Sequence, residues 1–185
     1  SSTSQITNTY VQMLYDDADL DTVADDASGI FKVATSTTAL TATYNLDGSH
    51  VYLEKNDDGT YKDQDGDRVP DYVAPVVTYS YDVDADGDPK NYYDENGRRI
   101  YGVLGRVVET THAVMKTFDV FGNWTKSTVT NTYTHIKRTI SPGIFADSGI
   151  FKVTKSSTNI DDSYNLDGSK VTYNVPQNIW YTYSN

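Results

Sequence analysis

The segment Ser28-Gly29-Ile30-Phe31-Lys32-Val33 returns later in the chain as Ser148-Gly149-Ile150-Phe151-Lys152-Val153, and this repeat decides the predicted fold. A second segment, Tyr44-Asn45-Leu46-Asp47-Gly48-Ser49, returns as Tyr164-Asn165-Leu166-Asp167-Gly168-Ser169 at the same offset of 120 residues. The first segment is rich in β-branched and aromatic residues, and the second contains the Asp-Gly pair that favours a tight hairpin turn. The repeat therefore predicts two related β units.

A third match extends the repeat upstream, because residues 6–10 (Ile-Thr-Asn-Thr-Tyr) correspond to residues 129–133 (Val-Thr-Asn-Thr-Tyr) at an offset of 123. The matches define one unit over residues 4–62, a second over residues 121–185 and an insert over residues 63–120. Two copies of a unit of about 60 residues are too few for a solenoid, which needs three or more stacked repeats. The 185 residues are therefore predicted to form a single domain with a duplicated unit.

The predicted elements are strands joined by turns and loops. The strands are Gln5–Tyr15 and Ile30–Thr35 in the first unit, Ser127–Arg138 and Ile150–Thr154 in the second, and Val76–Val83 and Arg106–Phe118 in the insert. Loops are predicted at residues 16–26 and 139–147, and type I′ turns at Asp47-Gly48 and Asp167-Gly168. With about eight to ten strands that alternate polar and apolar residues, the economical fold is an all-β one, a β-sandwich or two packed sheets.

Composition and charge exclude several classes of function. The formal net charge of −11 leaves no basic surface for a nucleic-acid backbone. No apolar run reaches the roughly 18 residues of a membrane-spanning helix, so membrane insertion is not expected. The chain has no cysteine, which excludes disulfides and thiol chemistry. The abundance of Thr, Ser, Tyr and Asp favours an extracellular or cell-surface location.

Two acidic loops in the insert carry the most specific chemical signal. Asp63-Gln64-Asp65-Gly66-Asp67 and Asp84-Ala85-Asp86-Gly87-Asp88 share the pattern D-x-D-G-D, and residues 57–88 hold ten Asp against Lys62 and Arg68. Alternating acids in a tight loop can direct several oxygen atoms at one hard cation. The pattern therefore predicts calcium binding, with a solvated acidic turn as the alternative.

The first loop resembles the calcium loops of thrombospondin type 3 repeats over Asp63 to Tyr72. The resemblance implies four side-chain ligands and one carbonyl ligand: Asp63, Asp65, Asp67, Asp71 and the carbonyl of Val69. The sequence departs from the family at two positions, with Arg68 in place of Gly and Ala74 in place of an acid. The second of these departures removes the usual bidentate ligand.

The candidate ligands of the second loop are Asp82, Asp84, Asp86 and Asp88. The sequence does not decide which residue begins this loop. A loop that starts at Asp82 ends at Tyr93, whereas a loop that starts at Asp84 ends at Glu95 and has a proline where glycine is expected.

Another pattern combines an aromatic residue, an acid and a glycine. Residues 93–98 (Tyr-Asp-Glu-Asn-Gly-Arg) and 118–125 (Phe-Asp-Val-Phe-Gly-Asn-Trp-Thr) resemble the motifs of YD-repeat (RHS) proteins, which form long β-shells on secreted bacterial proteins. The resemblance implies that the chain is part of a larger secreted shell. A plain β-hairpin with an Asp-x-x-Gly turn beneath an aromatic residue gives the same pattern.

The sequence does not favour an enzyme. The three histidines, His50, His112 and His135, form no cluster, and the odd spacing of Glu109 and His112 predicts that they lie on opposite faces of one strand. No nucleophile, zinc-ligand or phosphate-binding motif is present.

The favoured function is that of an extracellular structural subunit that assembles head to tail with copies of itself. The first strand, with Ile6, Asn8 and Tyr10, is predicted to add to the sheet of a neighbour. The uneven charge along the chain supports a head-to-tail contact, since residues 1–62 carry −7, residues 63–120 carry −6 and residues 121–185 carry +2. The alternatives are an adhesin that binds a glycan or a host surface, and a fragment of a YD-repeat shell. An amide cross-link from Lys32 or Lys152 to an asparagine is a further hypothesis.

Overall fold

The computed structural model describes residues 2–15, 26–43, 45–94, 96–141, 144–171 and 175–183. Every regular element in these ranges is a β-strand, which confirms the all-β prediction. The strands are β1 (Ser2–Tyr15), β2 (Asp26–Thr43), β3 (His50–Val51), β4 (Tyr72–Val73), β5 (Val76–Tyr81), β6 (Tyr92–Tyr93), β7 (Arg99–Ile100), β8 (Leu104–Thr111), β9 (Ala113–Phe118), β10 (Trp124–Ser141), β11 (Ile144–Tyr164) and β12 (Gln177–Trp180). The described residues include no candidate for a membrane-spanning helix.

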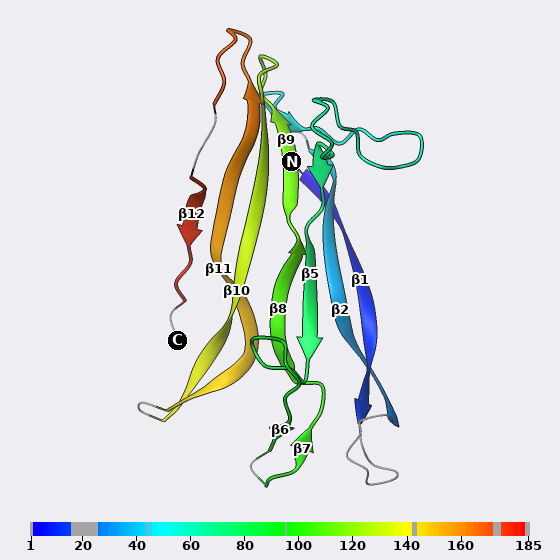
Figure 1. Ribbon diagram of the computed structural model, residues 1–185, viewed down its shortest axis with the longest axis vertical. Helices are drawn as coiled ribbons and strands as arrows, with labels where there is room; N and C mark the ends of the chain where they lie inside the picture. The colour runs from blue at the N-terminus through cyan, green and yellow to red at the C-terminus, as the bar shows by residue number, and fades with distance from the viewer. Residues whose placement is uncertain are drawn as a thin grey trace.

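The described strands form two main antiparallel sheets (Figure 1). One sheet has the order β1-β2-β5-β8, and the other has the order β12-β11-β10-β9-β3, with β4 also paired to β9. The strands β6 and β7 form a separate small hairpin. After the turn at residues 45–49, the chain leaves β2 and enters the other sheet, because β3 pairs with β9.

The two sheets share one continuous stretch of chain. The predicted strand Arg106–Phe118 is interrupted at His112, so that β8 pairs with β5 in one sheet and β9 pairs with β10 in the other. Figure 1 shows β9 continuing the line of β8, with β10 beside both. This shared stretch holds the two sheets together.

The repeated segments form two long hairpins with the same register. Tyr10 pairs with Val33 in the β1–β2 hairpin, and Tyr133 pairs with Val153 in the β10–β11 hairpin. The strand register shifts after Thr9 in the first hairpin and after Thr132 in the second, so this irregularity of pairing occurs at equivalent positions. Both hairpins are much longer than predicted.

Two predicted loops have different outcomes. The loop predicted at residues 16–26 lies outside the described residues except for Asp26, which begins β2. The loop predicted at residues 139–147 is wrong over most of its length, because β10 continues to Ser141 and β11 starts at Ile144. The backbone pairing of the two strands continues there, with position 137 opposite position 147.

Each of the two similar hairpins is joined by a third strand. The match between these two third strands is not apparent from the sequence. Strand β5 pairs with β2 at Thr35↔Thr78, and β12 pairs with β11 at Lys155↔Trp180, which is the corresponding place. The hydroxyl of Tyr81 donates to the carbonyl of Val33 at 2.9 Å, and the hydroxyl of Tyr183 donates to the carbonyl of Val153 at 2.6 Å. Residues 76–81 (Val-Val-Thr-Tyr-Ser-Tyr) therefore correspond to residues 178–183 (Asn-Ile-Trp-Tyr-Thr-Tyr).

The predicted type I′ turns at Asp47-Gly48 and Asp167-Gly168 are instead five-residue turns with one left-handed residue. Only the glycines have positive φ, +87° for Gly48 and +81° for Gly168. Each aspartate keeps negative φ, and its carboxylate accepts the backbone N–H two residues later, as in Asp47 with Ser49 at 3.0 Å. The same type of turn occurs at four other places, where the N–H of a glycine donates a hydrogen bond to the carbonyl three residues earlier. These turns lie at residues 56–60, 84–88, 94–98 and 119–123.

Half of the buried apolar side chains of the described residues lie on the shared stretch β8–β9. The buried apolar side chains of the described residues are Met13, Tyr52, Tyr72, Val107, Ala113 and Val114. At this junction the Glu109 side chain is 1% exposed, and its carboxylate accepts the backbone N–H of Asn131 at 3.0 Å. The same carboxylate lies 3.1 Å from Nδ1 of His112, so the prediction that these residues lie on opposite faces is wrong. The interruption of the strand at His112 reverses the expected direction of its side chain.

We expect Glu109→Ala to destabilise the fold by about 1–3 kcal/mol, because it leaves the N–H of Asn131 without an acceptor at the junction. The measurement is the free energy of unfolding in urea. His112→Ala is the matched control, since His112 is 48% exposed and its loss leaves the Asn131 bond intact. Equal costs for the two variants would contradict this role of Glu109.

Candidate functional site

The first acidic loop folds around its own aspartates. Backbone N–H groups of Gly66 and Arg68 donate to the carboxylate of Asp63 at 2.9 and 2.8 Å, and the N–H of Val69 donates to Asp67 at 2.7 Å. Arg68 has φ of +72°, so it adopts the left-handed conformation at the position where the resembled calcium loops have glycine. These backbone hydrogen bonds hold the loop closed around Asp63 and Asp67.

The loop closes over two lysines from neighbouring strands. Lys116 on β9 and Lys126 on β10 are directly opposed cross-strand partners. Their side chains are 2% and 1% exposed, respectively. Like charges in directly opposed positions repel each other, so this pair requires nearby anions. The loop supplies them, and we call Asp63, Asp65, Asp67, Asp71, Lys116 and Lys126 the loop cluster.

The ammonium group of Lys126 lies among the oxygens that the sequence assigned to calcium. Its Nζ lies 2.7 Å from the carbonyl oxygen of Val69 and 3.0 Å from both carboxylate oxygens of Asp67. It also lies 3.3 Å from Asp65 and 3.5 Å from Asp71. The predicted ligands Asp65, Asp67, Val69 and Asp71 are thus brought together, around a lysine of the same chain.

Asp71 is the least exposed member of the loop cluster. Its side chain is 0% exposed, and Oδ2 accepts the backbone N–H of Gln64 at 2.9 Å. Its Oδ1 makes no hydrogen bond within the described part of the chain, although Nζ of Lys116 and Nζ of Lys126 each lie 3.5 Å away. The Nζ of Lys116 also lies 4.2 Å from the ring centroid of Trp124, in a cation–π contact.

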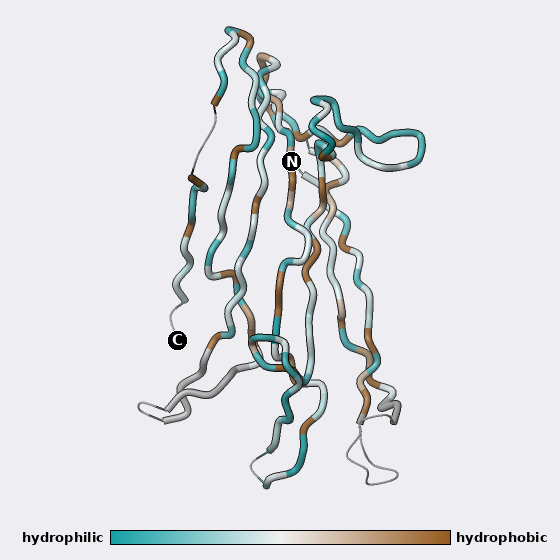
Figure 2. Tube along the Cα trace, viewed as in Figure 1, coloured by the Kyte–Doolittle hydropathy of each residue, from teal (hydrophilic) through white to brown (hydrophobic). Residues whose placement is uncertain are grey.

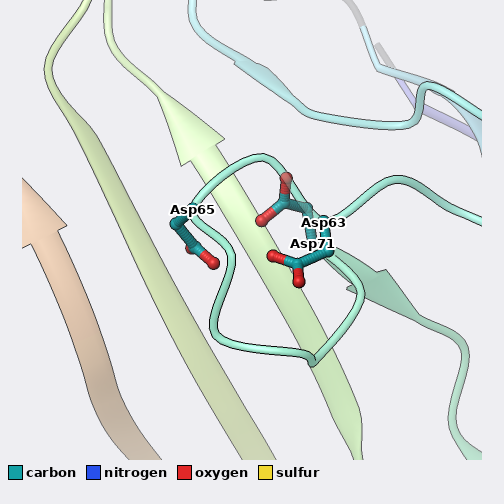
Figure 3. A group of neighbouring side chains, drawn as sticks. All are labelled: Asp63, Asp65 and Asp71. Carbon is teal, nitrogen blue, oxygen red and sulfur yellow. The ribbon is translucent and has the colours of Figure 1, made fainter.

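Three carboxylates of the loop cluster are positioned to hold a metal ion. Figure 3 shows Asp63, Asp65 and Asp71 directed toward one another, and one oxygen from each lies within 4.8 Å of the others. The four aspartates carry −4 and the two lysines carry +2, so the loop cluster has a formal charge of −2. That residual charge matches one divalent cation.

The pKa values of the loop cluster follow from burial and from Lys126. Burial raises the pKa of Asp65, and its contact with the Asp63 carboxyl group raises it further. Burial opposes a low pKa at Asp67, but the hydrogen bonds from Lys126 and from the backbone N–H of Val69, together with the charge of Lys126, lower that pKa. Burial likewise opposes a high pKa at Lys126, but the hydrogen bond to Asp67 and the charge of Asp65 raise it. The Lys126 ammonium is therefore held in its charged form.

The second acidic loop does not gather its aspartates into a ligand set. The carboxylate of Asp84 accepts the backbone N–H groups of Asp86, Gly87 and Asp88 at 2.9, 3.0 and 3.0 Å. Asp82 has positive φ, and its carboxylate accepts N–H groups of Gly102 and Val103 instead. Asp86 and Asp88 are exposed. Among the described residues, the acidic group arranged for a metal comes from the first loop alone.

The remaining predicted positions lie on the hairpins. Ile6, Asn8 and Tyr10 are exposed on β1, which pairs with β2 along its length and is therefore not a free strand. Lys32 donates to the carbonyl of Gly102 at 2.5 Å and lies over the ring of Tyr81, and Lys152 lies over Tyr183. His50 stacks on Phe118 and His135 stacks on Phe151.

Lys116 and Lys126 are the functional residues that sequence reasoning missed. Nothing in their local pattern distinguishes them from lysines on a solvent-facing strand. The one available signal is the excess of acid in the loop, which requires a cation from another part of the chain or from solution.

Stability is expected to fall as the pH drops below about 4, because the folded state lowers the pKa of many aspartates. These are Asp63 and Asp67 in the loop cluster and the turn aspartates Asp47, Asp58, Asp84, Asp94, Asp119 and Asp167, which accept hydrogen bonds from residues two to four positions later. A lowered pKa in the folded state contributes stability above the unfolded pKa of about 3.9, which is lost as the pH falls through the folded value. The denaturation midpoint, measured across pH, checks this.

Asp119→Asn keeps an acceptor in its turn but no longer titrates, so its denaturation midpoint should depend less steeply on pH than that of the wild type. A wild-type midpoint that does not change between neutral pH and about pH 3 would contradict the expectation.

Neither a protein-family model, nor a curated protein, nor a solved structure matches this chain.

Proposed function

We propose that the protein is an extracellular structural subunit that assembles head to tail through the open edges of its sheets and is stabilised by calcium. The observation that carries the proposal is the repeat of β1-β2-β5 as β10-β11-β12 around the shared stretch β8–β9. In the middle of the chain, β8 covers the edge of β5 and β9 covers the edge of β10. The corresponding edges of β12 and β1 are uncovered among the described strands.

Exposure of equivalent side chains supports association at these edges. Ile6 and Tyr10 on β1 are 64% and 61% exposed, whereas their counterparts Val129 and Tyr133 on β10 are half-buried beside β8 and β9. Figure 2 shows hydrophobic segments along the β1–β2 hairpin. A second copy that lay against β1 would cover Ile6 and Tyr10 as β8 and β9 cover their counterparts.

The total surface also favours assembly. The chain has 12053 Å² of accessible surface, about a third more than the roughly 8,900 Å² expected for a compact protein of 20.6 kDa. The acidic β1 end and the basic β12 end attract each other, since residues 1–62 carry −7 and residues 121–185 carry +2. A contact between unlike ends does not close on itself, so it produces a filament or a layer.

The five-residue turns favour a second candidate, a segment of a larger secreted β-shell. Turns closed in the same way recur at residues 45–49, 56–60, 84–88, 94–98, 119–123 and 165–169. In that case the edges of β1 and β12 are covered by further units of the shell. An isolated chain would then unfold with poor cooperativity rather than polymerise.

For the assembly, we expect the wild-type chain to polymerise in calcium and the double variant Ile6→Lys/Tyr10→Lys to stay monomeric, because charged side chains block edge pairing. The measurements are light scattering after size exclusion and electron microscopy. Thr38→Lys is the matched control, since Thr38 is exposed on β2 opposite Ile6 but is not on the sheet edge.

The control should polymerise, and both variants should keep wild-type stability within about 0.5 kcal/mol. A wild-type chain that is monomeric at high concentration in calcium would refute the assembly, and binding of that monomer to a glycan would favour the adhesin.

For calcium, we expect weak binding by the wild type, in the millimolar to submillimolar range of extracellular sites, and tighter binding by Lys126→Met. The substitution empties the position surrounded by Asp65, Asp67 and the carbonyl of Val69, and it changes the formal charge of the loop cluster from −2 to −3. In chelator the variant should be less stable by about 3–5 kcal/mol, because buried carboxylates lose their partner. Calorimetric titration and melting with and without calcium test both effects.

Lys62→Met is the control for the calcium experiment, because Lys62 pairs with the exposed Glu54 outside the loop cluster. It should bind calcium like the wild type. Absence of calcium binding by Lys126→Met would show that the loop is not a calcium site.

A further inference from the structure

We propose that Lys116 and Asp71 condense to an intramolecular amide, which cross-links the acidic loop to β9. The proposal concerns a covalent modification and does not depend on assembly or on calcium. It starts from the two groups that the loop cluster leaves least satisfied, the Nζ of Lys116 and the Oδ1 of Asp71.

The two reacting groups are buried and adjacent. Lys116 is 2% exposed and Asp71 is 0% exposed, and the distance from Nζ to Oδ1 is 3.5 Å. The backbone fixes this proximity, because the N–H of Lys116 donates to the carbonyl of Asp71 at 2.8 Å and Tyr72 pairs with Met115. Such positioning makes the reaction effectively unimolecular, which is worth several orders of magnitude in rate.

The hydrogen-bond pattern distinguishes Lys116 from Lys126. Nζ of Lys126 donates to the Asp65 and Asp67 carboxylates and to the carbonyl of Val69. Nζ of Lys116 instead faces Asp71 and Asp65 at 3.5 and 3.7 Å and the ring of Trp124 at 4.2 Å. Lys116 is therefore the lysine free to react, while Lys126 is engaged by the loop.

The reaction balances without any added reagent. The nitrogen of Lys116 bonds to Cγ of Asp71, and the bond from Cγ to Oδ1 breaks. Two protons of the former ammonium leave with Oδ1 as water, and the third stays on the amide nitrogen. The positive and negative charges cancel, so one ion pair becomes one neutral amide and one water molecule.

Neighbouring groups are placed to assist each part of this reaction. The backbone N–H of Gln64, 2.9 Å from Oδ2 of Asp71, stabilises the negative charge that develops on that oxygen during attack. The Asp65 carboxylate, 3.7 Å from Nζ of Lys116, is placed to pass protons from nitrogen to the leaving oxygen. The Trp124 ring beside Nζ excludes water from the attacking nitrogen.

Condensation also removes an unfavourable arrangement. Two buried charges that are imperfectly hydrogen-bonded cost desolvation free energy, which a neutral amide avoids. The positive charge opposite Lys126 disappears as well, so the repulsion across the β9–β10 pair ends. The amide oxygen left on Asp71 is still a ligand type that calcium accepts, so the cross-link is compatible with the metal site.

The test is the intact mass of the purified, folded wild-type chain, followed by peptide mapping. We expect a mass lower than the sequence mass by one water molecule, and a branched peptide in which Lys116 is joined to Asp71. Lys116→Met should have its full sequence mass, whereas Lys126→Met, its cross-strand neighbour, should still lose one water.

An aspartate–glycine succinimide also loses water, but it joins no second peptide and does not require Lys116. A wild-type mass equal to the sequence mass overturns the proposal, as does a loss of water that persists in Lys116→Met. If the variants fail to fold, the wild-type mass and the identity of the branched peptide decide the matter, and a branch at Lys126 refutes the assignment to Lys116.

Discussion

The burial of two directly opposed lysines is the constraint on which the arrangement of this protein depends. Lys116 and Lys126 share one face of the β9–β10 pair and are almost fully withdrawn from solvent. Two buried ammonium groups at this distance are tolerable only beside several carboxylates. The long, mostly hydrophilic connection between β3 and β4 supplies them, so an electrostatic requirement attaches that connection to the sheet (Figure 2).

The second organising feature is the stretch β8–β9, which belongs to both sheets. Its interruption at His112 directs the chain from the edge of β5 to the edge of β10, and the buried Glu109 carboxylate replaces the missing ladder partner of Asn131. Each three-stranded repeat is thus completed by a neighbouring strand only at the centre of the chain. Among the described strands, the outer edges of β1 and β12 have no neighbour, and the proposed assembly uses these edges.

The loop cluster unites the chemistry proposed for this protein. Three of its carboxylates lie close enough together to hold a metal ion, and Lys126 of the same chain lies among the oxygens of the loop. Its second lysine faces a buried carboxylate oxygen that lacks a hydrogen bond within the described residues. An internal cation and a metal ion each offset the excess of negative charge, whereas the proposed amide removes one buried ion pair and leaves the formal charge unchanged.

From the amino-acid sequence alone, the all-β class, the positions of the Asp-Gly turns and the acidic loop that contains Asp63, Asp65 and Asp71 could be predicted. These features depend on local patterns, namely the alternation of polar and apolar residues, Asp-x-x-Gly turns and an internal repeat. Such patterns involve residues that are close in sequence and do not depend on tertiary contacts. The pairing of β3 and β4 with β9, the burial of Lys116 and Lys126, and the contact of His112 with Glu109 could not be predicted from the sequence. The reason is that these contacts join segments far apart in the chain, and the burial of a lysine depends on which distant carboxylates the fold places beside it.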